Sequence, residues 1–521
     1  MATNKKIKIL LTGLFIIQAA FSYQAIGQTY TNPIIHEDYS DPDAIRVGNK
    51  YYMTASSFTS IPGLPILSST DLVHWELVNY ALTQNLPIDY YKKVQHGAGV
   101  WAPSIRFHKG EFYIYYPDPD FGIYVVKSKD PLGKWSQPEL VLAGKGFIDP
   151  CPLWDEDGKV YLVHAYAGSR AGIKSVLAMK EMNASGTKII NEGKLIYDGH
   201  GIDPTVEGPK LYKRNGWYYV FAPAGGVATG WQIVLRSKNI YGPYERKIAM
   251  EQGATKVNGP HQGAWVQTPL GSDWFLHFQD KGAYGRITHL QPMSWNKDWP
   301  VIGADPDGDG MGNPVSNFAL PQAPVSLTPV KGLDPFLDFQ WNANPAPHWR
   351  MAFENGHRNY AVINTEAGNN LWNFPAMYLR KLNAATFTAV TEIKFNALQI
   401  GERAGFILFG KSYAALELAN TANGLQLNYV VADKADKGNA EIITPLLQNA
   451  SSHLFIKLQM EPGGLARFYY SINGTDYTSL NNSFVSTLGI WVGTKIGFYC
   501  ASSKPTNDAG YLEIKSFTIQ K

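Results

Sequence analysis

The 521-residue sequence contains only two cysteines, Cys151 and Cys500. So few thiols exclude a disulfide framework, and their wide separation predicts two buried free thiols in different domains. Charged residues are also scarce, at 17%, and the formal net charge is only +3. With 45% hydrophobic residues, the composition excludes a disordered chain and fits a large packed core. The length is typical of two or three domains.

Long apolar runs are absent beyond the N-terminus, so no later segment predicts a membrane span. Three lysines precede an apolar stretch at 9–20 and small residues at 25–27, which predicts a signal peptide over residues 1–27. We therefore expect an exported protein, either periplasmic or secreted. A membrane anchor is the alternative, although the apolar stretch is short for a span. Loss of the three lysines leaves a net charge of zero, which argues against nucleic acid and, after signal removal, against a membrane as partner.

Several catalytic motifs are missing. The sequence has no glycine loop that would hold phosphates, no zinc-binding His-Glu pair and no Gly-x-Ser-x-Gly elbow. Aromatic residues, in contrast, are plentiful at 13%, with 14 Trp and 30 Tyr. Such an excess is typical of an all-β protein, of a sugar-binding surface, or of both.

One local pattern recurs five times. A turn containing glycine is followed by a β-rich run with aromatic or branched residues, and the spacing between copies is roughly 50 to 60 residues. The five copies are 48–56, 110–116, 158–165, 216–223 and 271–279. A repeat of this length, made of short strands, predicts a five-bladed β-propeller over residues 28–320. A β-sandwich with accidental spacing is the alternative.

A second feature repeats with the first. Ser-x-Asp or Ser-x-Asn followed by an aromatic residue occurs at 69–75, 128–135 and 237–244. We interpret these segments as hairpin turns between the outer strands of a blade.

Carboxylates occur about ten residues upstream of three of the five aromatic strands. They are Asp41 and Asp149, each followed by proline, and Glu207; the other two copies have Trp101 and His261 there. The first strand of each blade lines the propeller axis, so residues at equivalent positions should converge at one end of it. Converging carboxylates repel one another and shift each other's pKa values, which is typical of a catalytic site. The alternative is that each is a turn-forming Asp-Pro or a strand cap.

Carboxylates beside aromatic rings fit the hydrolysis of glycosidic bonds. One acid protonates the leaving oxygen, one base activates water, and aromatic faces stack on the sugar. A third carboxylate can keep the acid protonated and oriented.

At these residues the sequence resembles glycoside hydrolase family 43, which includes five-bladed inverting β-xylosidases and α-L-arabinofuranosidases. The matching stretches are 32–58, 100–116, 147–165 and 206–223. The resemblance implies that Asp41 is the general base, that Glu207 is the general acid, and that Asp149 raises the pKa of the acid and orients it. It also implies inversion, for which base and acid lie about 6.5 to 9.5 Å apart.

The resemblance assigns four further residues to substrate binding. Phe58 would wall the terminal subsite, Trp101 would pack beside the sugar, and Arg286 would contact sugar hydroxyls. His261 matches the axial histidine of the family, which acts directly or through water or a central ion. The structural alternatives are core packing for the two aromatic residues, a salt bridge for Arg286 and a satisfied core histidine for His261.

The loop at 305–314 invites comparison with calcium loops, because Asp305, Asp307 and Asp309 alternate. The closing bidentate glutamate is missing, since Ser316 stands at that position, and a turn-rich surface loop is the preferred interpretation. We expect no metal at the catalytic site and no required cofactor. A structural calcium, here or at the propeller axis, is left open.

A second domain is predicted after a Pro-rich linker at 321–332. Residues 333–521 contain strand-like runs that alternate with glycine and asparagine turns, the pattern of a jelly-roll-like β-sandwich. The stretch 338–349 resembles the C-terminal sandwich of family-43 xylosidases, in which a sandwich loop closes one side of the active pocket. An independent carbohydrate-binding module is the alternative.

These observations predict an all-β, exo-acting, inverting glycosidase that releases terminal α-L-arabinofuranose from plant cell-wall oligosaccharides derived from hemicellulose. β-D-Xylosidase as the main activity is the alternative, because the two sugars present similar hydroxyl and ring-oxygen positions. A non-catalytic carbohydrate-binding propeller is the competing hypothesis from another class. An endo-arabinanase is disfavoured by the closing sandwich, and the sequence does not indicate an oligomeric state.

Overall fold

The computed structural model describes residues 28–321, 333–334, 336–352, 358–361, 363–366, 368–504 and 507–521. The predicted signal peptide and nearly all of the predicted linker lie outside these residues. In the part described, the chain is all-β, as expected, with one short helix, α1 (Gly168–Ala171). Its 3-10 turns are η1 (Tyr90–Lys92), η2 (Gly282–Tyr284), η3 (Pro347–Trp349) and η4 (Ala435–Lys437). None of the described helices is long and apolar enough to cross a membrane.

The N-terminal part contains five four-stranded antiparallel sheets, each formed by four strands consecutive in sequence. The first is β2 (Asp43–Val47), β3 (Lys50–Thr54), β4 (Gly63–Ser69) and β5 (Glu76–Leu82). The second is β6 (Ser104–His108), β7 (Glu111–Asp118), β8 (Gly122–Ser128) and β9 (Glu139–Ala143). The third is β10 (Phe147–Trp154), β11 (Val160–Tyr166), β12 (Val176–Met182) and β13 (Lys194–Asp198). The fourth is β14 (Lys210–Arg214), β15 (Trp217–Ala224), β16 (Trp231–Ser237) and β17 (Glu245–Met250), and the fifth is β18 (His261–Gln267), β19 (Asp273–Asp280), β20 (Arg286–Asn296) and β21 (Trp299–Ile302).

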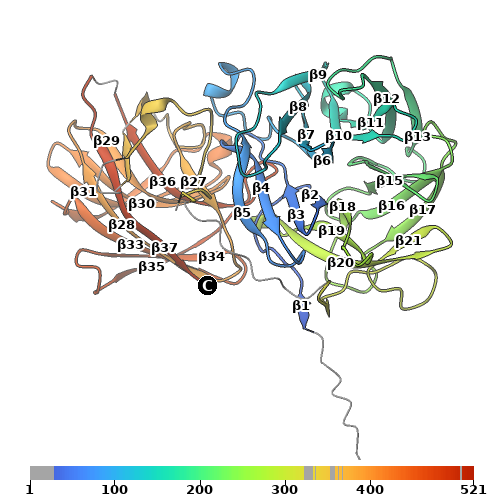
Figure 1. Cartoon of the computed structure of the whole chain (residues 1–521). Helices are drawn as coiled ribbons and strands as arrows, with labels where there is room; N and C mark the ends of the chain where they lie inside the picture. Colours follow the sequence, from blue (N-terminus) through green and yellow to red (C-terminus); the bar gives the residue numbers. More distant parts are fainter. Residues whose placement is uncertain are drawn as a thin grey trace, which may run out of the picture.

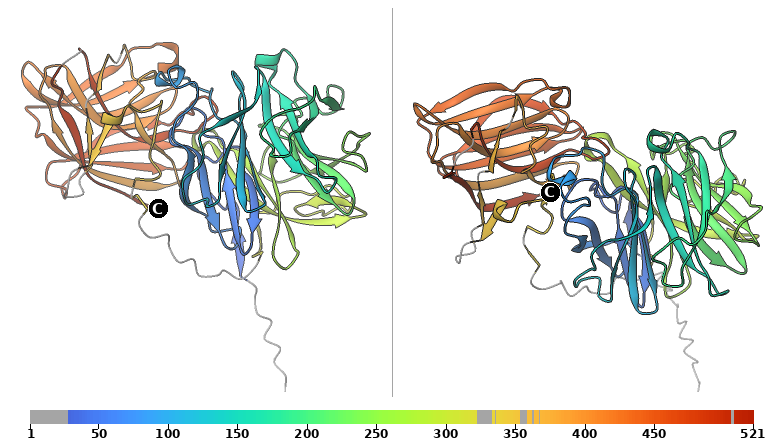
Figure 2. Two further views of the ribbon diagram at one scale, coloured as in Figure 1. Left: turned by 45° about the horizontal axis from the view of Figure 1, so that its top comes forward. Right: turned by 90° about the horizontal axis from the view of Figure 1, so that it is seen from above.

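The five sheets follow one another around a ring (Figures 1 and 2). The inner strands β2, β6, β10 and β14 contact in that order, β15 contacts β18, and β18 returns to contact β2. The two ends of this part are also joined, because β1 (Thr29–Thr31) pairs with β22 (Asn317–Ala319). This is the arrangement expected of five blades around one axis.

The repeated sequence features fall where they were predicted. The five aromatic runs form the second strand of each sheet, from β3 to β19. The Ser-x-Asp/Asn segments lie between the third and fourth strands of three sheets. In the first of them, Ser69 Oγ accepts the amide of Leu72 at 3.0 Å, and Asp71 Oδ1 accepts the amide of Val73 at 2.9 Å. These short polar side chains fold the turn by binding the backbone a few residues ahead.

The C-terminal part consists of two larger sheets, consistent with the predicted sandwich. One has the order β23 (Gln340–Trp341), β27 (Tyr378–Lys381), β36 (Lys495–Ser502), β29 (Glu402–Phe409), β30 (Tyr413–Thr421), β31 (Gly424–Ala432) and β32 (Ile442–Gln448), with β26 (Ile363–Glu366) also paired to β36. The other has the order β24 (Arg350–Ala352), β25 (Arg358–Ala361), β37 (Tyr511–Gln520), β28 (Phe387–Asn396), β33 (His453–Glu461), β34 (Leu465–Ser471) and β35 (Thr478–Val485).

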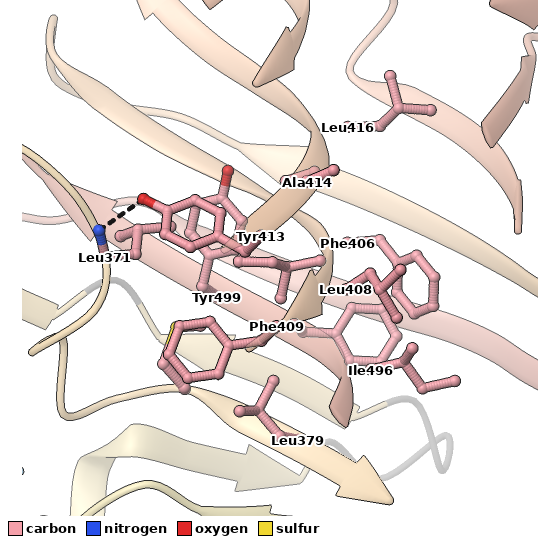
Figure 3. Close-up of a cluster of buried hydrophobic side chains, with 14 of the residues drawn as sticks. Leu371, Leu379, Phe406, Leu408, Phe409, Tyr413, Ala414, Leu416, Ile496 and Tyr499 are labelled. Atoms are coloured by element: carbon pink, nitrogen blue, oxygen red, sulfur yellow. Dashed lines mark hydrogen bonds between the residues drawn. The ribbon is translucent and has the colours of Figure 1, made fainter. Parts of the chain in front are cut away.

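The core of this part lies between the two sheets. Side chains of β28 alternate between buried and half-buried along its whole length, as a strand with one face in a core must. Figure 3 shows part of the cluster, in which the Tyr413 hydroxyl accepts the amide of Leu371 at 2.7 Å. Cys500 is buried in this core and Cys151 in the N-terminal part, and both are free thiols, which confirms that prediction.

The two parts pack against each other (Figure 2). The Ile61 amide donates to the Trp341 carbonyl at 3.0 Å. Asn344 accepts the Asn85 amide at 2.8 Å and donates to the Asn85 carbonyl at 3.0 Å. The ammonium of Lys495, itself buried, reaches Ser60 Oγ at 2.7 Å. Polar contacts from distant parts of the sequence therefore fix the sandwich on the loops of the first sheet.

Candidate active site

The three predicted catalytic carboxylates line one cavity of about 260 Å³. Asp41 lies just before β2, Asp149 lies in β10, and Glu207 lies just before β14, so each comes from the entry to an inner strand. The cavity is lined by Asp41, Phe58, Trp101, Ala102, Ile148, Asp149, Thr205, Glu207, Gly226, Val227, Gln262, Arg286 and Trp491. The circular arrangement of the five sheets therefore brings together residues that are far apart in the sequence.

The equivalence of the three carboxylates differs in detail from the prediction. Asp41 and Asp149 have φ values of 55° and 57°, and each precedes a proline. In the fourth sheet the residue with this conformation is Gly208, at φ 57°, and in the fifth it is Gln262, at φ 53°. Glu207 therefore stands one residue before the strictly repeated position. The left-handed conformation is strained for a residue with a side chain, and such strain is concentrated at functional sites.

Asp41 is buried and well held. The Arg286 guanidinium donates through Nη1 to Asp41 Oδ1 at 3.1 Å and to Oδ2 at 3.4 Å. Ser56 Oγ donates to Oδ2 at 2.5 Å. A carboxylate with these donors keeps a fixed orientation, as a base that must aim at one water molecule requires.

Asp149 and Glu207 are electrostatically linked. Burial, together with the nearby Asp149 and Asp41 carboxylates, raises the pKa of Glu207 to about 8. Burial likewise raises the pKa of Asp149 to about 7. The Gly208 amide, which donates to Asp149 Oδ2 at 2.7 Å, acts in the opposite direction and lowers this pKa. Glu207 is thereby kept protonated near neutral pH, the state that a general acid needs.

Aromatic side chains form the walls of the cavity. Phe58 is buried on one side, and Trp101 is half-buried with its indole N–H donating to the Gly97 carbonyl at 2.8 Å. Trp491, from the sandwich, meets Trp101 edge to face at a centroid distance of 6.3 Å. The Arg286 guanidinium lies 5.9 Å from the centre of the Trp491 ring. A loop of the C-terminal part therefore contributes directly to the cavity.

His261 is not on the cavity wall. It is 1% exposed, its ring packs edge-on against Phe278 at 5.3 Å, and burial lowers its pKa to about 4. The neighbouring residue, Gln262, lines the cavity instead. The structure thus places a neutral histidine in the core behind the wall, but neither ring nitrogen has a hydrogen-bond partner among the described residues, so it is not the satisfied core histidine of the structural alternative. Action on the site through water or a central ion stays a prediction.

The aspartate loop near residue 305 lies apart from this cavity. Carboxylate oxygens of Asp305, Asp307 and Asp309 lie within 4.8 Å of one another, the only such grouping found in the described part of the chain. Asp305 accepts the amides of Gly308 at 2.9 Å and Gly310 at 3.0 Å. The loop thus uses these carboxylates in its own turns, and their grouping could also hold a metal ion, so a structural calcium here is neither supported nor opposed.

Sequence reasoning named six of the thirteen lining residues, and Gln262 and Trp491 are among the seven that it missed. Gln262 could have been found by aligning the five repeats residue by residue, because it occupies the position of Asp41 and Asp149. Trp491 carries no such signal, since it lies in a different domain and outside any repeat. Its place depends on how the sandwich docks.

An acid with a raised pKa and a separate, tightly held carboxylate in an aromatic pocket are the features of a glycoside hydrolase. Residues 30–300 match Glycosyl hydrolases family 43, and residues 334–520 match the Beta xylosidase C-terminal Concanavalin A-like domain. The chain belongs to glycoside hydrolase family 43, as its motifs indicated.

Relatives with assigned names agree with this family. The chain is 37% identical to a protein of Xylanibacter ruminicola that is provisionally named a β-xylosidase, over 90% of this chain and 86% of the relative. It is 31% identical to a β-xylosidase of Formosa agariphila, over 94% and 90%. A non-reducing end α-L-arabinofuranosidase of Bacteroides ovatus is 29% identical, over 78% of each chain.

Solved structures share the fold of the whole chain. A family-43 protein of Bacillus licheniformis superposes with a TM-score of 0.81 at 24% identity, covering 94% of this chain and 99% of that one. A xylan β-1,4-xylosidase of Bacillus halodurans gives a TM-score of 0.80 at 22% identity, covering 94% and 100%. Both parts of the chain are therefore present in these structures.

Proposed function

We propose that this protein is an exo-acting, inverting β-D-xylosidase that removes terminal non-reducing xylose from hemicellulose-derived oligosaccharides. The observation that carries the proposal is the cavity in which Asp41, Asp149 and Glu207 meet. The names of the two relatives above 30% identity support xylose as the terminal sugar. This reverses the order predicted from sequence, which placed α-L-arabinofuranosidase activity first.

The proposed reaction uses side chains alone, so no resident cofactor is required. Glu207 donates its proton to the glycosidic oxygen as the bond to the anomeric carbon breaks. Asp41 removes a proton from water, and the oxygen of that water bonds to the anomeric carbon from the opposite face. The products are the shortened oligosaccharide and a free sugar with inverted configuration. Asp149 holds Glu207 in its protonated state, and Arg286 keeps Asp41 aimed.

The shape of the cavity supports exo action. Its volume of about 260 Å³ lies below the range of about 300–1,000 Å³ typical of pockets for drug-sized ligands. Trp491 of the sandwich closes one side of it. Such a pocket favours one terminal sugar ring over an extended chain that passes through.

Terminal α-L-arabinofuranose is the second candidate substrate. The arabinofuranosidase of Bacteroides ovatus is the observation in its favour, because it matches over 78% of this chain. Both activities would use the same three carboxylates, so the choice rests on how the cavity walls fit the ring.

We propose that the natural partner is plant cell-wall oligosaccharide and that the protein acts after export, in the periplasm or outside the cell. The support for export is the N-terminal segment alone, with its lysines, apolar stretch and small residues. Cleavage after Gly27 is measurable as the mass of the mature protein from its native host.

The test of the proposed function compares two aryl glycosides. We expect the purified protein to hydrolyse aryl β-D-xyloside with a higher kcat/KM than aryl α-L-arabinofuranoside, and NMR of the first product to show the inverted anomer. A higher kcat/KM on the arabinofuranoside would instead make α-L-arabinofuranosidase the main activity. Binding of soluble sugars without hydrolysis of either compound would favour a non-catalytic propeller.

A further inference from the structure

Asp38 lies three residues before Asp41, outside the cavity, and is 6% exposed. Its two carboxylate oxygens hold two distant pieces of backbone. Oδ1 accepts the amide of Arg286 at 2.9 Å, and Oδ2 accepts the amide of Gly493 at 2.8 Å. Arg286 belongs to the fifth sheet, whereas Gly493 lies in the sandwich, two residues after Trp491.

The backbone around this carboxylate is packed too closely for side chains. A Cβ at Gly285 would lie 2.3 Å from Asp38 Cγ, and a Cβ at Gly493 would lie 2.6 Å from the Gly285 nitrogen. The Thr494 amide also donates to the Ala283 carbonyl at 2.7 Å. The loop just before β36 and the start of β20 therefore touch directly, with Asp38 bonded to both.

A second clamp joins the segment before β20 to other parts of the sandwich. The Tyr284 hydroxyl donates to the Ala385 carbonyl at 2.9 Å and accepts the Gly464 amide at 3.0 Å. The segment immediately before Arg286 is thus held by the sandwich from both sides. Arg286 is the residue that donates to Asp41, so the position of the base depends on how this segment sits.

The Asp38 carboxylate also interacts with two lysines at this interface. Lys495 is buried and Lys381 is half-buried; burial lowers the pKa of Lys495 to about 8, and the Asp38 carboxylate acts against that shift. It acts in the same sense on Lys381, whose ammonium lies 3.7 Å from the centre of the Tyr39 ring. A neutral side chain at position 38 would leave these cations with less compensation.

We infer that Asp38 is a positioning residue that couples the docking of the sandwich to the catalytic geometry. Through Oδ1 it sets the backbone from which Arg286 reaches Asp41, and through Oδ2 it sets the loop that carries Trp491. The inference deepens the proposed function and rests on it for its catalytic consequence. Asp38 touches neither substrate nor the reacting atoms.

The decisive variant is Asp38→Asn, which keeps the size of the side chain and one acceptor but cannot accept both amides. Since a misplacement of about 1 Å can cost about 100-fold in rate, we expect kcat to fall about 10- to 100-fold and KM for the aryl xyloside to rise. The matched control is Asn344→Ala, which breaks contacts between the two parts at Asn85 and touches neither Arg286 nor Trp491. We expect its kcat and KM per folded enzyme to stay within about twofold.

A double-mutant cycle separates positioning from simple loss of stability. If Asp38 acts through Arg286, the two substitutions are not independent. The fold-loss in kcat of the double variant Asp38→Asn/Arg286→Lys should then be clearly smaller than the product of the fold-losses of the two single variants. Losses that multiply would overturn the inference, as would an Asp38→Asn enzyme with unchanged kcat and KM.

Hydrogen exchange gives a readout that needs no activity. In Asp38→Asn we expect faster amide exchange in both 283–288 and 489–495, and in Asn344→Ala in neither segment. Should Asp38→Asn fail to fold, Gly493→Ala displaces the same loop while keeping the carboxylate, and the same two segments should respond. Unchanged exchange in either segment would refute the coupling, whereas a wild type inactive on both glycosides would refute only the proposed function.

Discussion

The amide of Gly208 donates to the Asp149 carboxylate at 2.7 Å. Gly208 directly follows Glu207, so Asp149 holds the turn that carries the proposed acid. The same carboxylate is, after burial, the first cause of the raised pKa of Glu207. Asp149 therefore acts on Glu207 twice, by fixing its backbone and by opposing its ionisation.

The charge effect of Asp149 is testable through the pH profile. If Glu207 is the general acid, its protonated form is the active one, and its raised pKa of about 8 should keep the enzyme active up to that region. In Asp149→Asn the opposing charge is gone, so the pKa of Glu207 falls and the alkaline limb of kcat moves to lower pH. The kcat at neutral pH should fall about 10- to 100-fold. Asp157→Asn, on an exposed turn of the same sheet, is the control and should leave the limb in place. An unmoved limb in Asp149→Asn would contradict this role.

The role of Glu207 as acid predicts a dependence on the leaving group. In Glu207→Gln no proton is donated, and we expect kcat on xylobiose to fall about 10²- to 10⁴-fold. An aryl xyloside with an acidic phenol as leaving group needs little protonation, so its kcat should fall far less. The two rates are measured on one enzyme preparation. Equal losses on both substrates would show that Glu207 does something other than protonate the leaving oxygen.

The sequence was most informative where the fold repeats. Asp41 and Asp149 each precede proline at the entry of an inner strand, and a ring of sheets necessarily brings such positions to one end of the axis. The placement of Glu207 was correct to within one residue of the repeat, because Gly208 takes the left-handed conformation in its place. Local turn chemistry is read easily from sequence, and here it fixed most of the N-terminal part.

The remaining features depend on contacts that no repeat encodes. His261 was expected to act on the site directly or through water or a central ion, and the structure places its side chain behind the wall while Gln262 lines the cavity, so only the indirect role stays a prediction. A one-residue difference at a strand entry reverses which side chain points inward, and β18 is irregular at this point, with a register shift between His261 and Gly263. Trp491 reaches the cavity only because the sandwich docks through polar contacts such as Asp38 with Gly493. These contacts join segments of no shared pattern, so periodicity cannot predict them.

The aromatic wall from the sandwich predicts an effect on substrate binding. Trp491 is 48% exposed, lines the cavity and contacts the Trp101 ring edge to face. Loss of the aromatic ring in Trp491→Ala should raise KM for aryl xyloside about 10-fold. A 10-fold change corresponds to about 1.4 kcal/mol, which is near the upper end of the range of about 0.5–1.5 kcal/mol for one aromatic contact. Because catalysis lies with other residues, kcat should change much less. Phe107→Ala is the control, since Phe107 is 43% exposed at the other end of the inner strands. A KM that responds equally in both variants would remove the sandwich from the binding site.

The raised pKa of Glu207 also carries a cost in stability that depends on pH. Its pKa rises from an ordinary value of 4.5 in the unfolded chain to about 8 in the folded one, chiefly through burial. The contribution of this group to folding is therefore fully present below about pH 4.5 and is lost as the pH rises towards about 8. Glu207→Gln has no proton to lose, so its Tm should equal that of the wild type at pH 4 and exceed it by about 4–8 °C at pH 8. Thermal unfolding at several pH values, with the exposed Glu192→Gln as control, measures this difference. A Tm difference that stays constant across this pH range would mean that Glu207 ionises as readily in the folded protein as in the unfolded chain.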